Sequence, residues 1–583
     1  MSKKSFSMVI WSGIFFIFLN FNTAVAGPDA NSASRERLLR PDLTENLLGA
    51  IAYLEDTQIR NRPGKGHPTS DSTEEGDGAK SEVTFNLPFK ENLPIPAPPV
   101  LKIRNRTGEW ASHVHFLPKK TGFNGRNLVS VQDSNVFMTT FIGYPLFLVD
   151  DSELPANRQF ISRILPLAMK NVESFKLGAA YNFWAAQPGV FGKDERTGPF
   201  NIPPELISKL AKAFINPRFD KFFAFLTRGL KTPPKFWVEQ CLDPKNPTGA
   251  DALFNIPNDA DDTATAVAFQ ALYRKKYPKA RLADSAALKH VSGYRDLDRS
   301  REDGRDLWKG KKTGAFLTWM KDENQPIFGT PGTGVIPLGV NNVDCVVNAN
   351  VVFSLAVNNM KDTPGYSDAV NLLVQAIEKH AWPDAGLYYP QYMIFPYTAT
   401  RAWRDGGARE PQLTKAMEKL LKDLLGEQET YGKRNPAILG AFPGGEDRSD
   451  HLSTALGLSA LLNIGRGTAE KIGMSGQFDR GVSLAVAYIC RSGRNRDMAY
   501  PTTREIFSAP KMKVRAWLSG LFFSASFWDL GHWRSEPFTV SMVAEALAKY
   551  ALAYDLDRGA FGKRQLRLTE DPNSRWGLKF EAR

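Results

Sequence analysis

Two kinds of helical segment alternate along most of the chain from about residue 110 onward. In the first kind, apolar residues recur at the three- and four-residue spacing of an amphipathic helix. In the second kind, small and apolar residues occupy nearly every position, so the helix would be buried on all sides. The amphipathic candidates are residues 158–175, 205–214, 366–380, 412–425 and 480–491.

The second kind of segment recurs six times, each time directly after a polar or acidic turn. The six segments begin near Asp133, Asp261, Asn341, Phe395, Asp447 and Glu536. Repetition of an apolar helix with an amphipathic one indicates helical hairpins, and hairpins bury their apolar members by closing into a ring. We therefore predict an all-α fold, an (α/α)6 toroid with the amphipathic helices outside. A helical solenoid that stays open is the structural alternative.

The first 110 residues lack this pattern. Lys3 and Lys4 precede an apolar run at residues 8–21, and small residues follow at 24–27, which is typical of a secretory signal peptide cleaved after Ala26. The prediction is a secreted or periplasmic protein, with an uncleaved N-terminal anchor as the alternative. We expect residues 27–110 to form an irregular N-terminal extension, with one helix near 43–54 and a proline-rich linker at 93–100. Residues 111–565 would form the toroid domain and 566–583 a C-terminal tail.

The charge pattern argues against a nucleic-acid partner. The formal net charge is +12, but lysine and arginine are spread along the chain without a long basic block. The three cysteines, Cys241, Cys345 and Cys490, form no CxxC pair and allow at most one disulfide. The seven histidines are scattered, so we expect no metal site and no cofactor.

The most acidic helix start holds three carboxylates within four positions: Asp259, Asp261 and Asp262. One helix needs one capping carboxylate, and like charges this close repel each other. We expect Asp261 or Asp262 to cap the helix, and at least one of the three acids to have a functional role.

In a closed ring, the first turns of the inner helices lie at one end, where their polar side chains would share a mouth. Beside the three acids, we predict substrate-binding roles there for Asp344, Asn342, Asn348, Tyr397, Glu446, Asp450 and His451. Capping is the competing explanation for a single acid at a helix start, and it applies to Asp133, Asp344 and Asp450.

The sequence DADDTA at residues 259–264 resembles the DxDDTA motif of class II terpene cyclases, the squalene–hopene and diterpene cyclase group. That superfamily also has an αα-toroid fold. The resemblance is local and implies that the middle acid, Asp261, donates a proton to an alkene or epoxide, with Asp259 and Asp262 in support. Asp261 can donate only if its pKa is raised, so a hydrogen-bond partner such as His451 or Tyr397 would matter.

Two other functions are compatible with the same residues. A secreted glycoside hydrolase or lyase would use two carboxylates from different repeats, Asp261 or Asp262 with Glu446 or Asp450. Its substrate would be an oligosaccharide rather than a small prenyl molecule. A non-catalytic periplasmic scaffold would use the acids only as helix caps. The aromatic segment at residues 517–533 suggests either core packing or peripheral contact with a membrane surface.

Overall fold

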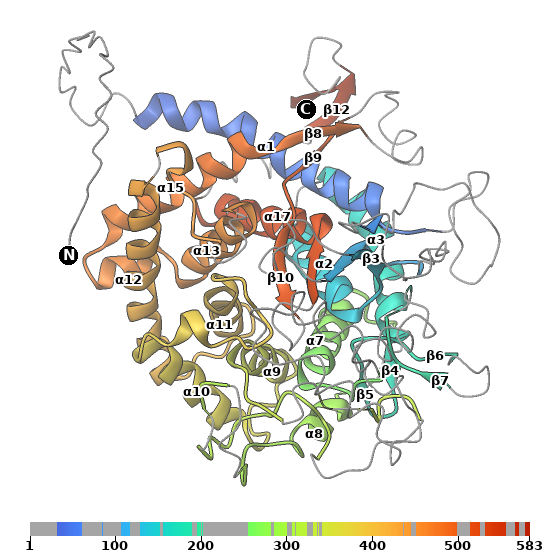
Figure 1. Ribbon diagram of the computed structural model, residues 1–583. Coiled ribbons are helices and arrows are strands. Elements are labelled where there is room, and N and C mark those ends of the chain that lie inside the picture. The colour runs from blue at the N-terminus through green and yellow to red at the C-terminus, as the bar shows by residue number, and fades with distance from the viewer. Residues whose placement is uncertain are drawn as a thin grey trace, which may run out of the picture.

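The computed structural model (Figure 1) describes the following residues: 32–60, 84–85, 106–116, 129–151, 155–188, 195–199, 201, 255–280, 285–299, 306–308, 311–322, 330–334, 336, 341–434, 436–444, 450–497, 513–524, 531–554, 566–570 and 578–582. The predicted signal peptide, the helix candidate at 205–214 and the proline-rich linker lie outside these residues.

Six helices in the described part of the chain form a closed inner ring, each packed against the next and the last against the first (Figure 1). In ring order they are α2 (Val136–Asp151), α7 (Ala260–Lys276), α9 (Cys345–Val357), α11 (Ile394–Arg404), α13 (Asp450–Ile464) and α17 (Glu536–Ala553). The six correspond to the six apolar segments expected from the sequence. The predicted all-α class is confirmed.

The amphipathic helices pack on the outside of this ring. They are α3 (Pro155–Glu173), α8 (Ala286–Val291), α10 (Tyr366–Glu378), α12 (Pro411–Arg434) and α15 (Ser475–Ser492), with the short α14 (Arg466–Lys471) between α12 and α15. Helices α3, α10, α12 and α15 match four of the amphipathic segments expected from periodicity. Two 3-10 turns, η4 (Trp382–Asp384) and η5 (Pro436–Ile438), lie in the connections.

Helix α9 illustrates why an inner helix forms where it does. Asp344 caps it by accepting hydrogen bonds from the backbone N–H groups of Val346 and Val347, which satisfies donors that the helix itself cannot. Every residue from Cys345 to Ala356 is then buried, including the free thiol of Cys345. An all-round apolar helix is stable only when neighbours cover every face, which the ring provides.

The N-terminal extension is more regular than expected where the structure describes it. Helix α1 (Ser32–Thr57) is longer than the predicted helix at 43–54 and packs against α17, α3 and α15 as an outer element. Tyr53 donates a hydrogen bond to Glu536 at the start of α17, over 2.6 Å. The indole of Trp110 donates to the carbonyl of Leu54 over 2.8 Å. Helix α1 therefore belongs to the outer layer of helices.

A five-stranded antiparallel sheet, absent from the sequence prediction, lies beside the ring. Its order is β1 (Thr84–Phe85), β3 (Val129–Asp133), β2 (Ser112–Phe116), β11 (Gly531–Ser535) and β10 (Gly520–Ser524). Helical periodicity gives no signal for such short strands, and the pairing of β2 with β11 joins segments far apart in sequence. Strand β10 reaches toward the centre of the ring (Figure 1).

Four two-stranded ribbons complete the described structure. They are β4 (Lys176–Leu177) with β5 (Ala180–Tyr181), β6 (Gln187–Pro188) with β7 (Glu195–Arg196), β8 (Arg494–Asp497) with β9 (Lys513–Ala516), and β12 (Leu566–Glu570) with β13 (Leu578–Ala582). The last ribbon lies in the expected C-terminal tail. Among the described helices, none combines the length and apolar character needed to cross a bilayer.

Candidate active site

The three clustered acids lie at the N-terminus of α7, and all three are buried. Asp259, not Asp261 or Asp262 as expected, is the N-cap residue: its Oδ1 accepts the backbone N–H of Asp262 over 2.7 Å. The expectation was wrong because the helix begins at Ala260, which places both Asp261 and Asp262 inside the first turn. The backbone N–H of Ala260 donates to the carbonyl of Thr318 over 2.8 Å, which fixes the cap against a neighbouring segment.

The carboxyl of Asp261 is held by side chains from two other parts of the ring. Asn350 of α9 donates its side-chain N–H to Oδ1 over 2.6 Å, and the hydroxyl of Tyr389 donates to Oδ2. Burial raises the pKa of Asp261 to about 7, and the charge of Asp259 adds to that rise. The two hydrogen bonds act in the opposite direction because they stabilise the charged form. Near neutral pH, a carboxyl with this pKa can both hold and release a proton.

Asp259 and Asp262 are neighbouring buried acids, and each shifts the pKa of the other. Burial raises the pKa of Asp262 well above its ordinary value, and the charge of Asp259 together with a hydrogen bond between the two carboxyls raises it further. That hydrogen bond lowers the pKa of Asp259, in opposition to its burial. The pKa of Asp259 is raised as well, because its burial outweighs that bond. Asp261 therefore lies beside two buried acids whose pKa values are also raised.

The two partners expected for Asp261 bind elsewhere. Tyr397 donates to Glu545 of α17 over 2.6 Å. His451 accepts the backbone N–H of Leu518 at Nδ1 over 3.3 Å, and burial lowers its pKa to about 4. That expectation was wrong because sequence alone does not say which inner helices are adjacent to α7.

Asp344 is the acid at the start of α9. One oxygen accepts the two capping N–H groups of its own helix, and the other accepts the backbone N–H of Leu387, over 2.5 Å, and of Tyr388, over 3.1 Å. Burial nevertheless raises its pKa to about 6, because desolvation outweighs these bonds. Asp344 thus joins α9 to the loop that carries Tyr389.

Asn342 and Asn348 anchor the segment beside the acid cluster. Asn342 accepts from Thr318 and donates to the hydroxyl of Tyr388, each over 2.7 Å. Asn348 accepts the backbone N–H of Phe316 and donates to its carbonyl, each over 3.0 Å. Their polar groups are engaged in bonds within the protein, and a substrate contact for either residue remains a prediction. Glu446 and the side chain of Asp450 lie outside the described residues.

Asp133 is not the cap of α2. Asn135 makes the capping bond, by accepting the backbone N–H of Met138 over 3.0 Å. Asp133 instead accepts the indole N–H groups of Trp184, over 2.9 Å, and of Trp533, over 2.7 Å. The carboxyl of Asp133, at the end of β3, therefore joins Trp184 to Trp533 of β11.

Aromatic side chains occupy the ring interior next to Asp261. The ring of Tyr389 lies 5.7 Å from that of Phe137 and 5.6 Å from that of Phe523, between centroids. Phe137 in turn stacks near Phe522, which lies 4.9 Å from Phe538. Two of these rings belong to the aromatic segment for which membrane contact was an alternative. Of the described rings in that segment, Trp517, Phe522 and Trp533 are buried and Phe523 is partly buried.

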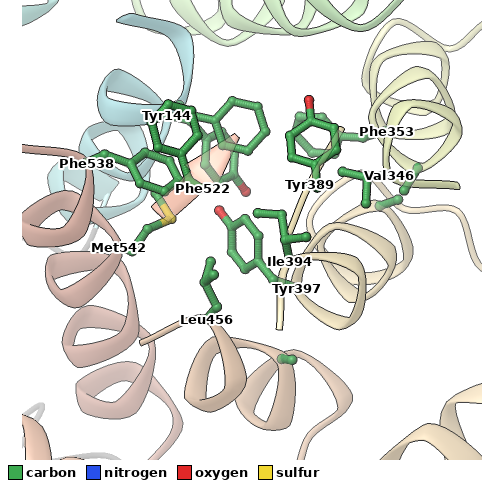
Figure 2. Packing of buried hydrophobic residues seen from close by; sticks show 14 of the residues in the cluster. Tyr144, Val346, Phe353, Tyr389, Ile394, Tyr397, Leu456, Phe522, Phe538 and Met542 are labelled. Carbon is green, nitrogen blue, oxygen red and sulfur yellow. The ribbon is translucent and has the colours of Figure 1, made fainter. Parts of the chain in front are cut away.

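Side chains from separate inner helices converge on the same interior. Figure 2 shows Tyr144 of α2, Phe353 of α9, Tyr397 of α11, Leu456 of α13 and Phe538 of α17 directed toward one another. The interior at these side chains is therefore lined by aromatic and apolar groups, with the buried guanidinium of Arg401 among them. Among the described residues, no grouping of histidine, cysteine and acidic side chains suits a metal ion.

Comparison with known proteins gives only distant similarities. No family model matches the chain, and no curated protein does so. Among solved structures, a protein from Actinoplanes aligns at 14% identity and TM-score 0.38 over 76% of this chain and 94% of its own. The type II terpene cyclase MstE from Scytonema aligns at 12% identity and TM-score 0.33, over 71% of this chain and 99% of its own. A variant of that cyclase bound to geranylgeranyl dihydroxybenzoate has the same identity and TM-score over 70% of this chain. Similarity this weak does not establish the family of this chain.

Two residues at the site were not singled out by sequence reasoning: Tyr389 and Arg401. Arg401 carried a usable signal, since it is a charged residue inside an inner helix and is buried. A buried polar group must find a partner. Tyr389 had no comparable signal, because it lies among many aromatic residues in a loop.

Proposed function

We propose that the protein is a terpene-cyclase-like enzyme in which Asp261 protonates an alkene or epoxide of a prenyl substrate. The observation that carries this proposal is the state of one carboxyl. Asp261 is buried, its pKa is raised to about 7, and it lies beside the aromatic interior of the ring. Protonating an unactivated double bond demands an acid that reaches the substrate without water between them.

The proposed step transfers the carboxyl proton of Asp261 to one carbon of the double bond. The O–H bond of the acid breaks, a C–H bond forms, and the positive charge develops on the other alkene carbon. The next double bond of the chain supplies the electrons for ring closure. Loss of a proton from the final cation to a base ends the sequence, and Asp261 takes up a proton from solvent.

The surroundings of Asp261 favour a developing cation. The faces of aromatic rings attract positive charge, by about 0.5–2 kcal/mol for each well-placed ring. Tyr389, Phe137 and Phe523 lie in mutual contact beside the acid. The nearby acids Asp344 and Asp259 also favour positive charge in the same region, whichever of them is ionised.

Two polar features that would oppose this chemistry are already engaged. The oxygens of Asp344 bind backbone N–H groups, and the amide of Asn348 binds a backbone segment. These groups do not need a substrate to satisfy them. The polar character of the helix starts is therefore compatible with an apolar reaction space.

Cleavage of an oligosaccharide, by a hydrolase or a lyase reaction, remains the alternative function. It needs a second carboxyl opposite Asp261 or Asp262, and the residues named for that role are Glu446 and Asp450. Glu446 and the side chain of Asp450 lie outside the described residues, so this pairing stays a prediction. A non-catalytic scaffold is the third outcome.

The test is a substrate screen of the purified protein with matched variants. We expect polyprenyl substrates to give cyclised products, detected by mass spectrometry, and polysaccharides to be unchanged. Asp261→Asn keeps the size of the side chain but removes the proton, so it should lower product formation at least ~10³-fold. Asp368→Asn is the matched control, because Asp368 pairs with Arg295 near the surface. Cyclisation that survives Asp261→Asn would overturn the assignment of the acid, and cleavage of a polysaccharide would favour the alternative.

A further inference from the structure

Arg401 is a buried cation that the proposed chemistry leaves unexplained. It lies in inner helix α11 and is only 2% exposed. Within the described part of the chain, no carboxylate lies within ion-pair distance of it, and its Nε has no hydrogen-bond partner. A buried charge without an ion-pair partner is costly, so its retention calls for a physical explanation.

Four aromatic rings hold the guanidinium. Its central carbon lies 4.6 Å from the ring centroids of Phe141 and Phe353, 4.9 Å from Tyr144 and 5.4 Å from Tyr397. Attraction between a desolvated cation and ring faces offsets part of the cost of burial. The cage also restricts the guanidinium to one position, which makes its hydrogen bond directional.

The acids nearest to this cage are committed to another cation. Lys549 of α17 lies 2.7 Å from a carboxylate oxygen of Asp405 and 2.7 Å from one of Glu545. The hydroxyls of Tyr144 and Tyr397 donate to the same two acids, over 2.8 and 2.6 Å. Arg401 is therefore left with a neutral hydrogen-bond partner, which is Asn350.

The hydrogen bond between Arg401 and Asn350 determines which atoms of the Asn350 amide and of Asp261 donate and which accept. Nη2 of Arg401 donates to Oδ1 of Asn350 over 2.5 Å. Arginine has only donors, so the atom of Asn350 that faces it must be the carbonyl oxygen. The amide nitrogen of Asn350 then faces Asp261, and because that nitrogen is only a donor, Oδ1 of Asp261 must accept.

We propose that Arg401 is a positioning residue that, through the amide of Asn350, confines the acidic proton of Asp261 to Oδ2. Without Arg401, the amide of Asn350 could rotate by half a turn and present its oxygen to Asp261. Oδ1 could then carry the proton as well. The proposal deepens the proposed function and rests on Asp261 being the proton donor.

Oδ2 is the oxygen that binds Tyr389, whose ring contacts Phe137 and Phe523. A hydroxyl can donate or accept, so Tyr389 donates to Oδ2 of the ionised carboxylate and accepts from Oδ2 when that oxygen carries the proton, whereas the amide nitrogen of Asn350 can only donate to Oδ1. Confinement to Oδ2 therefore places the proton on the side of the acid that adjoins the aromatic interior. The geometry joins three inner helices: α11 provides the cation, α9 the amide and α7 the acid.

Other titratable groups around Asp261 are fixed by separate contacts. They are Asp259 and Asp262 on α7, Asp344 at the start of α9 and Tyr389 in the loop before α11, while Asp405, Glu545, Lys549, Tyr144 and Tyr397 surround Arg401. A change in Arg401 thus reaches Asp261 by two routes, through the Asn350 amide or directly by charge. The test must separate these routes.

The experiment measures the pKa of Asp261 in the full chain by pH-difference infrared spectroscopy of protonated carboxyl groups. The band of Asp261 is assigned by its loss in Asp261→Asn. Arg401→Met and Asn350→Leu should each raise the pKa of Asp261 by about 1 unit. Asn350→Leu removes the hydrogen bond that stabilises the carboxylate, and Arg401→Met removes the contact that holds the Asn350 amide in the orientation for that bond. Arg401→Lys, which retains a donor and the charge, should recover part of the shift.

The double variant Arg401→Met/Asn350→Leu distinguishes the two routes. If Arg401 acts through Asn350, the second substitution adds little to the first. A full additional shift from Arg401→Met in the Asn350→Leu background would overturn the proposal and leave only direct charge. An unchanged pKa in Arg401→Met would overturn it as well.

Tyr144→Phe is the matched control, since it keeps a ring over the guanidinium and removes only the hydroxyl that binds Asp405. We expect it to leave the pKa of Asp261 unchanged. Should Arg401→Met not fold, Asn350→Leu and Arg401→Lys still report on the same amide. The infrared measurement needs no substrate, so failure of the cyclase assignment would appear in the substrate screen and not here.

Discussion

Asn350 on α9 donates a 2.6 Å hydrogen bond to Asp261 on α7, across 89 positions of sequence and across the contact between two adjacent inner helices. The surroundings of Asp261 are therefore set by other helices of the ring as well as by its neighbours in sequence. The DADDTA segment supplies the carboxyl and the cap of its helix. The groups that adjust the acid come from α9 and from the loop before α11.

The first prediction concerns stability against pH. The pKa of Asp261 rises from 3.8 to about 7 on folding, so between these values the folded state binds more protons than the unfolded state. Stability from this group is therefore fully present below about pH 4 and is lost as the pH rises through 7. The loss amounts to about 4 kcal/mol at most, from about 3 units at ~1.4 kcal/mol each.

Urea unfolding of the wild type and of Asp261→Asn at pH 4 and pH 8 isolates this contribution. Buried histidines such as His115 and His451 have lowered pKa values and make stability rise with pH, so the wild type alone is not informative. We expect the variant to gain stability relative to the wild type as the pH increases. A difference that stays constant with pH would contradict the raised pKa of Asp261.

The second prediction separates the two roles of Asp259, capping and charge. Asp259→Asn retains an oxygen that can accept the N–H of Asp262 but removes the negative charge that raises the pKa of Asp261. We expect the pKa of Asp261 to fall below about 7 with the helix cap intact. Asp259→Ala removes the cap as well and should cost about 1 kcal/mol of stability.

Infrared titration and urea unfolding of both variants check this prediction. Similar downward shifts in the pKa of Asp261 with different stabilities are the expected pattern. A pKa of Asp261 that is unchanged in Asp259→Asn would mean that the charge of Asp259 does not contribute to the rise.

The third prediction concerns closure of the ring between α2 and α7. A Cβ atom at Gly143 would lie 2.5 Å from the ring of Phe269, so the two helices approach closely only because this side chain is absent. Gly143→Ala should destabilise the protein by about 1–3 kcal/mol through overpacking.

Gly426 on outer helix α12 provides the matched comparison. No atom lies within 4 Å of a Cβ built there, and alanine favours the helix by up to about 1 kcal/mol over glycine. Thermal unfolding should therefore move in opposite directions for Gly143→Ala and Gly426→Ala. Equal shifts would show that helix propensity, and not the contact with Phe269, controls both positions.

The six inner helices could be located from sequence because their signals are local. An all-round apolar helix such as α9 needs burial on every face, and its start carries a capping residue, here Asp344. The clustering of Asp259, Asp261 and Asp262 at the start of α7 likewise predicted a functional site, since a helix cap alone does not need three acids. These features depend on composition and spacing within one segment.

The tertiary structure decided the rest. The cap of α7 is Asp259, the cap of α2 is Asn135, and Asp133 binds two indoles. The sheet was missed because strands β2 and β11 pair residues more than 400 positions apart.

Sequence thus determined that Asp261 is a candidate acid on a buried helix. Only the packing of α7, α9 and α11 decided that Asn350 binds that acid and that Arg401 binds Asn350. The physical reason is that a hydrogen bond depends on the rotation of each helix about its axis and on which helices are neighbours. Neither quantity is encoded within a single segment.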